Sequence, residues 1–107
     1  MRGKPNLYVR PGTTPIISFY LPFEVDLVAE LWFTMVQRGV EVFTKELDDM
    51  EIEGSKIIVK MTQEETLKLA SGQKVEIQVR IRTTGDDAIA SQVETVDVDR
   101  ILKNGVI

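Results

Sequence analysis

The clearest strand in the sequence is the stretch Val75-Glu76-Ile77-Gln78-Val79-Arg80-Ile81-Arg82. Apolar and polar residues alternate along its whole length, which is the pattern of a β-strand with one buried face and one face in water. The same alternation recurs in Ile16–Leu21, Glu30–Gln37 and Lys56–Met61. The repeated pattern predicts an antiparallel β-protein in which each strand buries every second side chain.

Turn signals separate these strands. Arg38-Gly39 predicts a tight hairpin that returns the chain into Val40–Lys45, and Phe23–Val28 predicts a turn or one helical turn. A further short strand is expected near Met50–Ile52. The last strand, Ala88–Val98, changes parity between Val93 and Val96 and therefore predicts a bulge.

A helix signal lies between the third and fourth of the alternating stretches. Thr62-Gln63-Glu64-Glu65 has the spacing of a capping box, in which the Thr62 hydroxyl and the Glu65 carboxylate each accept from a backbone amide of the first turn. Gly72 follows where a left-handed helix end is expected. A helix of about two turns is too short to be stable alone, so we expect it to close one end of the core through Leu67.

About seven short strands and one short helix (about 62–71) before the penultimate strand predict an all-β fold, an immunoglobulin-like antiparallel β-sandwich. A small closed barrel is the alternative. The 107 residues correspond to one domain. We expect residues 1–15 to form a basic N-terminal arm and residues 16–107 to form the single sandwich domain.

The composition argues against an enzyme. The chain has no cysteine and no histidine, which excludes thiolate chemistry, a Ser-His-Asp arrangement and nearly every zinc site. The acidic stretch lacks the spacing of a calcium loop, and we expect it to be a solvated edge; its members are Glu46, Asp48, Asp49, Glu51 and Glu53. The remaining carboxylate candidates, Asp86 and Asp87 with Asp97 and Asp99, are expected to be turn and surface residues. No catalytic residue, metal or cofactor is predicted.

Charge is unevenly distributed along the chain. The net charge is −4, yet the first fifteen residues carry Arg2, Lys4 and Arg10 with no acid, which leaves −7 for the remainder. An acidic body repels phosphate, so we expect no nucleic-acid partner. No apolar run approaches the roughly 20 residues of a membrane helix, and the N-terminus does not resemble a signal peptide, so we expect no membrane partner.

Three places are predicted to contact a partner protein. The first is the face of Trp32, Thr34 and Val36, which lies opposite the expected core residues of the same strand and is covered either by the fold itself or by a partner. The second is the basic arm with Arg2, Lys4 and Arg10, either solvated or docked on an acidic neighbour. The third is the C-terminal segment with Ile101 and Leu102, which packs on its own domain or adds as a strand to a neighbouring copy.

Several stretches resemble small prophage-encoded proteins of Gram-positive bacteria. They are Gly12-Thr13-Thr14-Pro15 with Leu21-Pro22-Phe23, Leu31–Gly39, Thr62–Leu67, Val75–Arg80 and Arg100–Ile107. The sequence is also similar to the N-terminal immunoglobulin-like domain of phage baseplate upper proteins, which has a T-x-x-E-T helix before its penultimate strand.

This resemblance implies a structural protein of the phage particle, in the tail or baseplate, made in the bacterial host cytoplasm and located in the virion. Its implied partners are other phage structural proteins, including copies of itself, and the family supplies no catalytic residue. Two rival functions are considered. One is a carbohydrate-binding module in which Trp32 and Tyr20 stack on sugar rings, and the other is a small metal-dependent enzyme built on the acidic stretch.

Overall fold

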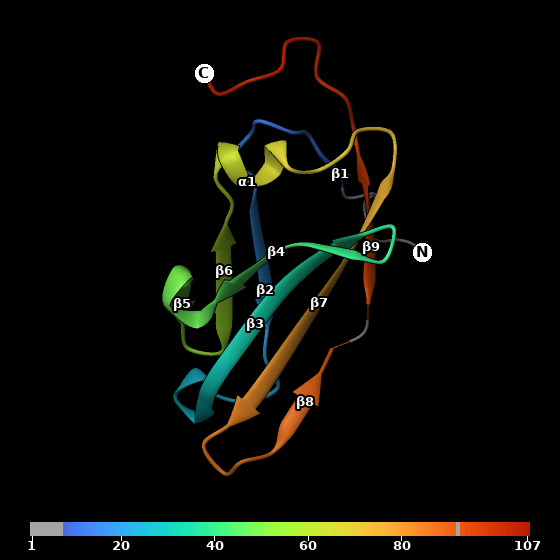
Figure 1. Ribbon diagram of the computed structural model, residues 1–107. Helices are drawn as coiled ribbons and strands as arrows, with labels where there is room; N and C mark the ends of the chain where they lie inside the picture. The colour runs from blue at the N-terminus through green and yellow to red at the C-terminus, as the bar shows by residue number, and fades with distance from the viewer. Residues whose placement is uncertain (1–7, 92) are drawn as a thin grey trace, which may run out of the picture.

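A computed structural model describes residues 8–91 and 93–107 of the chain, which form two packed β-sheets (Figure 1). The larger sheet has the strand order β1-β9-β7-β3-β4, with β8 also paired to β7, and the smaller sheet has the order β2-β6-β5. The larger sheet consists of β1 (Tyr8–Val9), β3 (Val28–Gln37), β4 (Val40–Glu46), β7 (Lys74–Thr83), β8 (Ala88–Ala90) and β9 (Glu94–Val98). The smaller sheet consists of β2 (Ile16–Tyr20), β5 (Glu51–Glu53) and β6 (Lys56–Lys60). The predicted all-β sandwich is confirmed.

The core lies between the sheets and is built from the alternation seen in the sequence. On β3 and β7 the predicted inward residues are buried, and Phe33, Met35 and Val75 are almost completely so. Phe19 of the smaller sheet stacks on Phe33 of the larger one, with ring centroids 6.4 Å apart. This contact joins the two layers through apolar side chains in a chain that has no cysteine to link them.

Each predicted connection takes a regular local form. Arg38 and Gly39 both have positive φ, 53° and 74°, which is the conformation of the two-residue turn that matches the twist of a hairpin. The segment expected to be a turn after β2 contains one 3₁₀ turn, η1 (Val25–Leu27), and a second, η2 (Leu47–Asp49), precedes β5.

The helix α1 (Gln63–Leu67) lies at one end of the sandwich, between β6 and β7 (Figure 1). The capping box is present: the Thr62 hydroxyl accepts from the Glu65 amide and the Glu65 carboxylate accepts from the Thr62 amide. The helix is shorter than the predicted 62–71, because Lys68 and Leu69 donate to carbonyls three residues back and tighten its end into a 3₁₀ turn.

The residue through which α1 reaches the core differs from the prediction. Thr66 is fully buried and Leu69 is 4% exposed, whereas Leu67 is only half-buried. The Thr66 hydroxyl donates to the Thr13 carbonyl at 2.9 Å, which satisfies it in the interior. Thr66 and Leu69 close this end of the core, and Leu67 instead lies beside Gly12.

The predicted last strand, Ala88–Val98, is interrupted between Ala90 and Glu94. β8 and β9 both pair with β7, and the register against β7 shifts by one residue between them. The predicted bulge between Val93 and Val96 is therefore wrong in position and form, because the shift lies between Ala90 and Glu94 and separates two strands.

The N-terminal region contributes a strand as well. Tyr8 and Val9, two residues of the predicted arm, form β1 and pair in parallel with Asp97 and Val98 of β9. Residues 1–7 lie outside the described residues, and the division into arm and sandwich remains a prediction. Within the described part of the chain, no helix is long and apolar enough to cross a membrane.

Candidate functional site

The outer face of the larger sheet carries the predicted contact residues of β3. Trp32, Thr34 and Val36 alternate with the buried side chains of the same strand and point away from the core. Trp32 is 42% exposed, and Thr34 and Val36 are half-buried. The face is therefore not covered by another layer of the described fold, although its role in binding remains a prediction.

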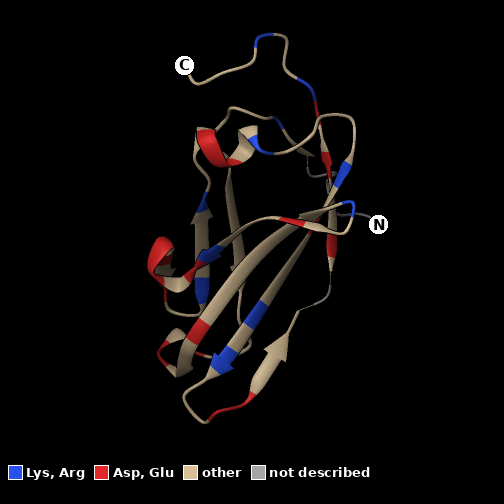
Figure 2. Cartoon of the chain, in the orientation of Figure 1, with Lys and Arg blue, Asp and Glu red and all other residues tan. Residues whose placement is uncertain are grey.

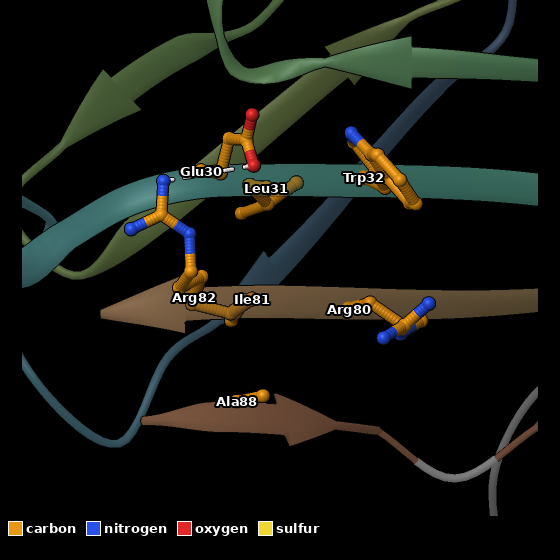
Figure 3. Close-up of a pocket in the computed structure, with 7 residues that line it drawn as sticks. All are labelled: Glu30, Leu31, Trp32, Arg80, Ile81, Arg82 and Ala88. Atoms are coloured by element: carbon orange, nitrogen blue, oxygen red, sulfur yellow. Dashed lines mark ion pairs between the residues drawn. The ribbon is translucent and has the colours of Figure 1, made fainter. Parts of the chain in front are cut away.

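Trp32 is held in place by a neighbour on β7. Arg80 pairs directly with Trp32 across the two strands, and its guanidinium lies 5.7 Å from the centre of the indole ring (Figure 3). This is cation–π distance, at which a partly exposed pair gains on the order of 0.5–1 kcal/mol. Beside it, Arg82 forms an ion pair with Glu30 at 3.8 Å.

Two shallow hollows flank this row of side chains. One, of about 140 Å³, lies between Trp32, Arg80, Arg82 and Glu30. The other, of about 230 Å³, lies further along β3 and is lined by Thr34, Val36, Glu76, Ile77, Gln78 and Val93. We call this surface the Trp32 face; it consists of Trp32, Thr34 and Val36 with their β7 neighbours Arg80, Gln78 and Glu76.

A hydrogen-bond chain fixes the β4 side of the Trp32 face. The hydroxyls of Thr34 and Thr44 are 3.1 Å apart, and Thr44 in turn donates to the Glu41 carboxylate at 2.7 Å. Both threonines are β-branched and have few rotamers, so this side of the face is stiff. A stiff, half-exposed aromatic surface loses little conformational entropy when a partner covers it.

The predicted basic contacts are only partly described. Arg10 stacks over the Tyr8 ring at 4.7 Å and forms an ion pair with Asp99 at 3.5 Å, so its charge is directed at its own domain. Arg2 and Lys4 lie outside the described residues.

The C-terminal segment lies over the α1 end of the sandwich (Figure 1). Ile101 is half-buried and its side chain approaches Gly12, whereas Leu102 is 93% exposed. The Gln63 side chain holds the end of the segment by accepting from the Ile107 amide at 2.8 Å and donating to the Ile107 carbonyl at 3.2 Å. The segment contacts its own domain at both ends and leaves Leu102 in water.

The carboxylates considered for chemistry are spread over the surface (Figure 2). Asp86 follows the end of β7, while Asp97 pairs with Lys74 at its beginning, so these acids lie at opposite ends of the strand. In the acidic stretch, Asp49 accepts from the Glu46 amide and caps η2. Among the described residues, no three acidic side chains form a group that could hold a metal ion.

A larger opening lies at one edge of the sandwich, between β2 and the strands β8 and β9. It has a volume of about 550 Å³ and is lined by residues of both sheets, many of them apolar. The lining consists of Ile17, Ser18, Phe19, Tyr20, Leu21, Pro22, Phe33, Ile77, Gln78, Val79, Ile81, Ile89, Ala90, Ser91, Glu94 and Val96. We call it the edge groove. Glu94 is the one charged residue among these described lining residues, and the sequence did not predict this opening.

The geometry bears on the carbohydrate-binding alternative. Tyr20 is 73% exposed but belongs to β2 of the smaller sheet, whereas Trp32 belongs to β3 of the larger sheet. The two rings therefore do not share one sheet surface, and a platform that stacks one sugar chain on both is not formed.

Sequence reasoning also missed Arg80 as a member of the Trp32 face. The alternation of β7 placed its side chain on the outer face, but the register that sets it opposite Trp32 is a long-range property. The available signal was an arginine at an outward position of a neighbouring strand, which is too common to single out a site.

Comparison with solved structures settles the architecture. A strand-swapped dimer of the immunoglobulin-like domain of mouse leukocyte-associated immunoglobulin-like receptor 1 matches with a TM-score of 0.50 and 11% identity, over 91% of this chain and 88% of that chain. The chain has an immunoglobulin-like fold. A second structure of the same mouse receptor, a strand-swapped dimer of its extracellular domain, has a TM-score of 0.49 over the same shares. The sequence matches no protein-family model and no curated protein.

At this identity the likeness concerns the fold alone. The inter-sheet disulfide of antibody domains has no counterpart in a chain without cysteine. Folds of this class carry many functions, so the function must be argued from the surfaces described above.

Proposed function

We propose that this immunoglobulin-like chain is a non-enzymatic protein-binding module that assembles with other proteins through its Trp32 face. The module acts as a structural component of a phage or prophage particle, in the tail or baseplate. Its partners are other structural proteins of the particle, including further copies of the chain.

The observation that most directly supports a protein-binding role is the exposure of Trp32 on a stiff sheet surface. Tryptophan and arginine are the residues most enriched among interface positions that dominate binding energy, and here they stack on each other. Apolar and hydrogen-bonding groups surround them, and the flanking hollows offer places for partner side chains. This combination of an aromatic anchor and a polar rim is typical of protein–protein interfaces.

The placement in a phage particle is supported by the sequence resemblance to baseplate proteins. Self-association is compatible with the fold, since the mouse receptor domain that shares it forms a strand-swapped dimer. The absence of histidine and cysteine supports a binding role over a catalytic one.

The test is incorporation into particles. A tagged copy of the chain is expressed in a bacterium that carries the gene in a prophage, the prophage is induced, and purified particles are analysed by quantitative mass spectrometry. We expect the chain at a fixed ratio to the tail proteins. Intact particles that lack the chain would contradict the placement in the virion.

Two variants then test the surface. Trp32→Ala removes the anchor of the Trp32 face, and Tyr20→Ala removes an exposed aromatic ring from the other sheet as a matched control. Loss of an anchor of this kind costs roughly 2 kcal/mol or more, or about a 30-fold weaker Kd. We expect Trp32→Ala to be depleted from particles and Tyr20→Ala to be incorporated normally; equal incorporation of the two would refute the assigned surface.

A further inference from the structure

We propose that two copies of the chain pair through the open edge of β2, antiparallel to each other about a two-fold axis at Ser18. The two smaller sheets, of three strands each, then form one continuous sheet. This inference concerns a different surface from the Trp32 face and stands independently of the proposed function.

The open edge of β2 lacks the protection that the other strands at the ends of the described sheets have. Exposed strand edges invite pairing with another chain, and short strands, charges and bulges prevent it. β1 and β8 have two and three residues, β5 has three with a glutamate at each end, and β4 has three charged residues and a register shift against β3. β2 has five residues without a charge and, among the described residues, pairs with β6 alone. Its free edge is therefore ready to accept a strand.

The main chain of β2 directs every second residue to the open edge. The Pro15 carbonyl accepts from the Met61 amide at 3.0 Å, and the Leu21 amide donates to the Ser55 carbonyl at 2.8 Å. Odd-numbered residues along β2 are therefore bonded to β6. In an antiparallel ladder the intervening residues direct their amides and carbonyls the other way. These even-numbered residues are Ile16, Ser18 and Tyr20.

The sequence of β2 is symmetric about Ser18, with two apolar residues on each side. In an antiparallel pair centred on Ser18, Ile16 lies opposite Tyr20 of the second copy, and Ile17 lies opposite Phe19 of the second copy. Even-numbered residues thus meet even-numbered residues, and each such pair can exchange two main-chain hydrogen bonds. Self-complementarity of this kind is what a two-fold interface requires, because the same patch serves both copies.

The pairing also covers apolar side chains on both faces of β2. On the outer face, Ile16 is 62% exposed and Tyr20 is 73% exposed, and an aromatic residue opposite a β-branched one stabilises an antiparallel pair. On the inner face, Ile17 and Phe19 line the edge groove and are only half-buried. A second β2 brings Ile17 of one copy against Phe19 of the other, at a non-hydrogen-bonded position, where opposed side chains are closest.

Charge permits two acidic copies to meet at this edge. The chain has a net charge of −4, so two copies repel each other over much of their surface. β2 itself is uncharged, and the charged residues beside it on β6 are Lys56 and Lys60, opposite Tyr20 and Ile16. In the pair, the lysines of one copy lie three strand spacings, roughly 14 Å, from those of the other, which exceeds the screening length of about 10 Å at 0.1 M salt.

Sedimentation equilibrium of the full chain tests the stoichiometry. The concentrations run from about 10 μM to 1 mM, because a strand pair is a small interface and such interfaces are weak. We expect the mean mass to rise to that of two chains and no further, since a two-fold contact is closed. The mass of one chain at every concentration would overturn the proposal. Trp32→Ala should show the same rise, and its failure to do so would show that the copies meet through the Trp32 face instead.

Two matched substitutions test the position of the contact. Ser18→Lys puts two lysines opposite each other at the axis, whereas Ile52→Lys puts the same charge on β5, the other end of the same sheet. Both positions are exposed, so both variants should keep the circular dichroism spectrum of the native fold. We expect Ser18→Lys to weaken association roughly fivefold or more, because like charges directly opposite each other destabilise a strand pair, and Ile52→Lys to leave it unchanged. Equal association of the two variants would refute the assigned edge. Tyr20→Ala keeps every main-chain hydrogen bond of the pair and should still associate.

Hydrogen exchange measured by NMR on dilute and concentrated samples tests the parity. We expect the amides of Ile16, Ser18 and Tyr20 to exchange several-fold more slowly in the concentrated sample, while those of Ile17 and Phe19, which are bonded to β6, change little. A dimer in which the even-numbered amides stay unprotected would place the contact on another surface. Protection of these amides in a single chain would show that another segment covers the edge. Either result would make the proposed pairing wrong.

Discussion

The ion pair between Lys45 and Glu65 gives a quantitative test of how α1 is attached to the sandwich. Lys45 occupies an inward position of β4, opposite Phe33, and its side chain is 8% exposed. Its ammonium donates to both carboxylate oxygens of Glu65 at 3.0 Å. The Glu65 side chain is 23% exposed and also accepts from the Thr62 amide at 2.9 Å. The Lys45 ammonium therefore depends on Glu65 as its partner more than the Glu65 carboxylate depends on Lys45.

This inequality predicts an asymmetric effect of removing either partner. Glu65→Ala leaves a buried ammonium without its carboxylate, which costs about 3–5 kcal/mol. Lys45→Met keeps the apolar stem of the side chain and leaves a carboxylate that still has water and the Thr62 amide, so we expect a cost of roughly 1 kcal/mol or less. The double variant should be more stable than Glu65→Ala, because it no longer buries an unpaired charge.

Urea unfolding followed by circular dichroism measures these differences. With a typical slope of about 2 kcal/mol per molar urea, a loss of ~4 kcal/mol lowers the midpoint by about 2 M. Glu64→Ala, an exposed neighbour in the same helical turn, is the control and should change the midpoint little. Equal midpoints for Glu65→Ala and Lys45→Met, or a double variant less stable than Glu65→Ala, would refute this account of the pair.

Three further predictions follow from single contacts. Gln37 is 7% exposed and its amide exchanges two hydrogen bonds with the backbone of residue 70, so Gln37→Ala should lower the free energy of unfolding by about 2–3 kcal/mol in urea titrations. Gln63 makes the same paired contact with the exposed end of the chain, and Gln63→Ala should cost less than about 1 kcal/mol; comparable losses would contradict this argument. Gly39→Ala should cost roughly 1–2 kcal/mol because φ is +74° with open space around it, and Gly12→Ala should cost more in the same titration, since its new Cβ would also meet a side chain at 3.3 Å. Trp32→Ala should change stability by less than the roughly 3 kcal/mol or more of a buried aromatic, and a larger loss by calorimetry would show that the residue acts as core.

The parity of the strands could be predicted from the sequence because it is a local property. Alternation along β7 fixed which residues face inward, and the capping box at Thr62 fixed where the helix begins. Both signals depend on residues within a few positions of one another. These local signals were sufficient to predict the β-sandwich and the position of α1.

The contacts between strands could not be predicted in the same way. Nothing local to Trp32 indicates that Arg80 stands beside it, since the two residues meet only through the register of β3 and β7. Lys45 is a similar case. A lysine at an inward strand position contradicts the alternation of apolar and polar residues, and only the fold brings Glu65 close enough to pair with it. The edge groove was missed because a sequence shows that Ile16–Tyr20 is a strand but not that it stands at the edge of its sheet.

The Trp32 face and the edge of β2 that pairs with no described strand offer a partner two different modes of attachment. An uncovered β2 edge would recruit any extended segment through main-chain hydrogen bonds, with little dependence on the side chains of the larger sheet. A partner that contacts the Trp32 face depends instead on the exposed indole of Trp32. A partner strand added to the edge of β2 would leave incorporation of Trp32→Ala normal while protecting the β2 amides from exchange. Measuring incorporation and β2 exchange together on assembled particles therefore distinguishes attachment through the Trp32 face from attachment through the groove.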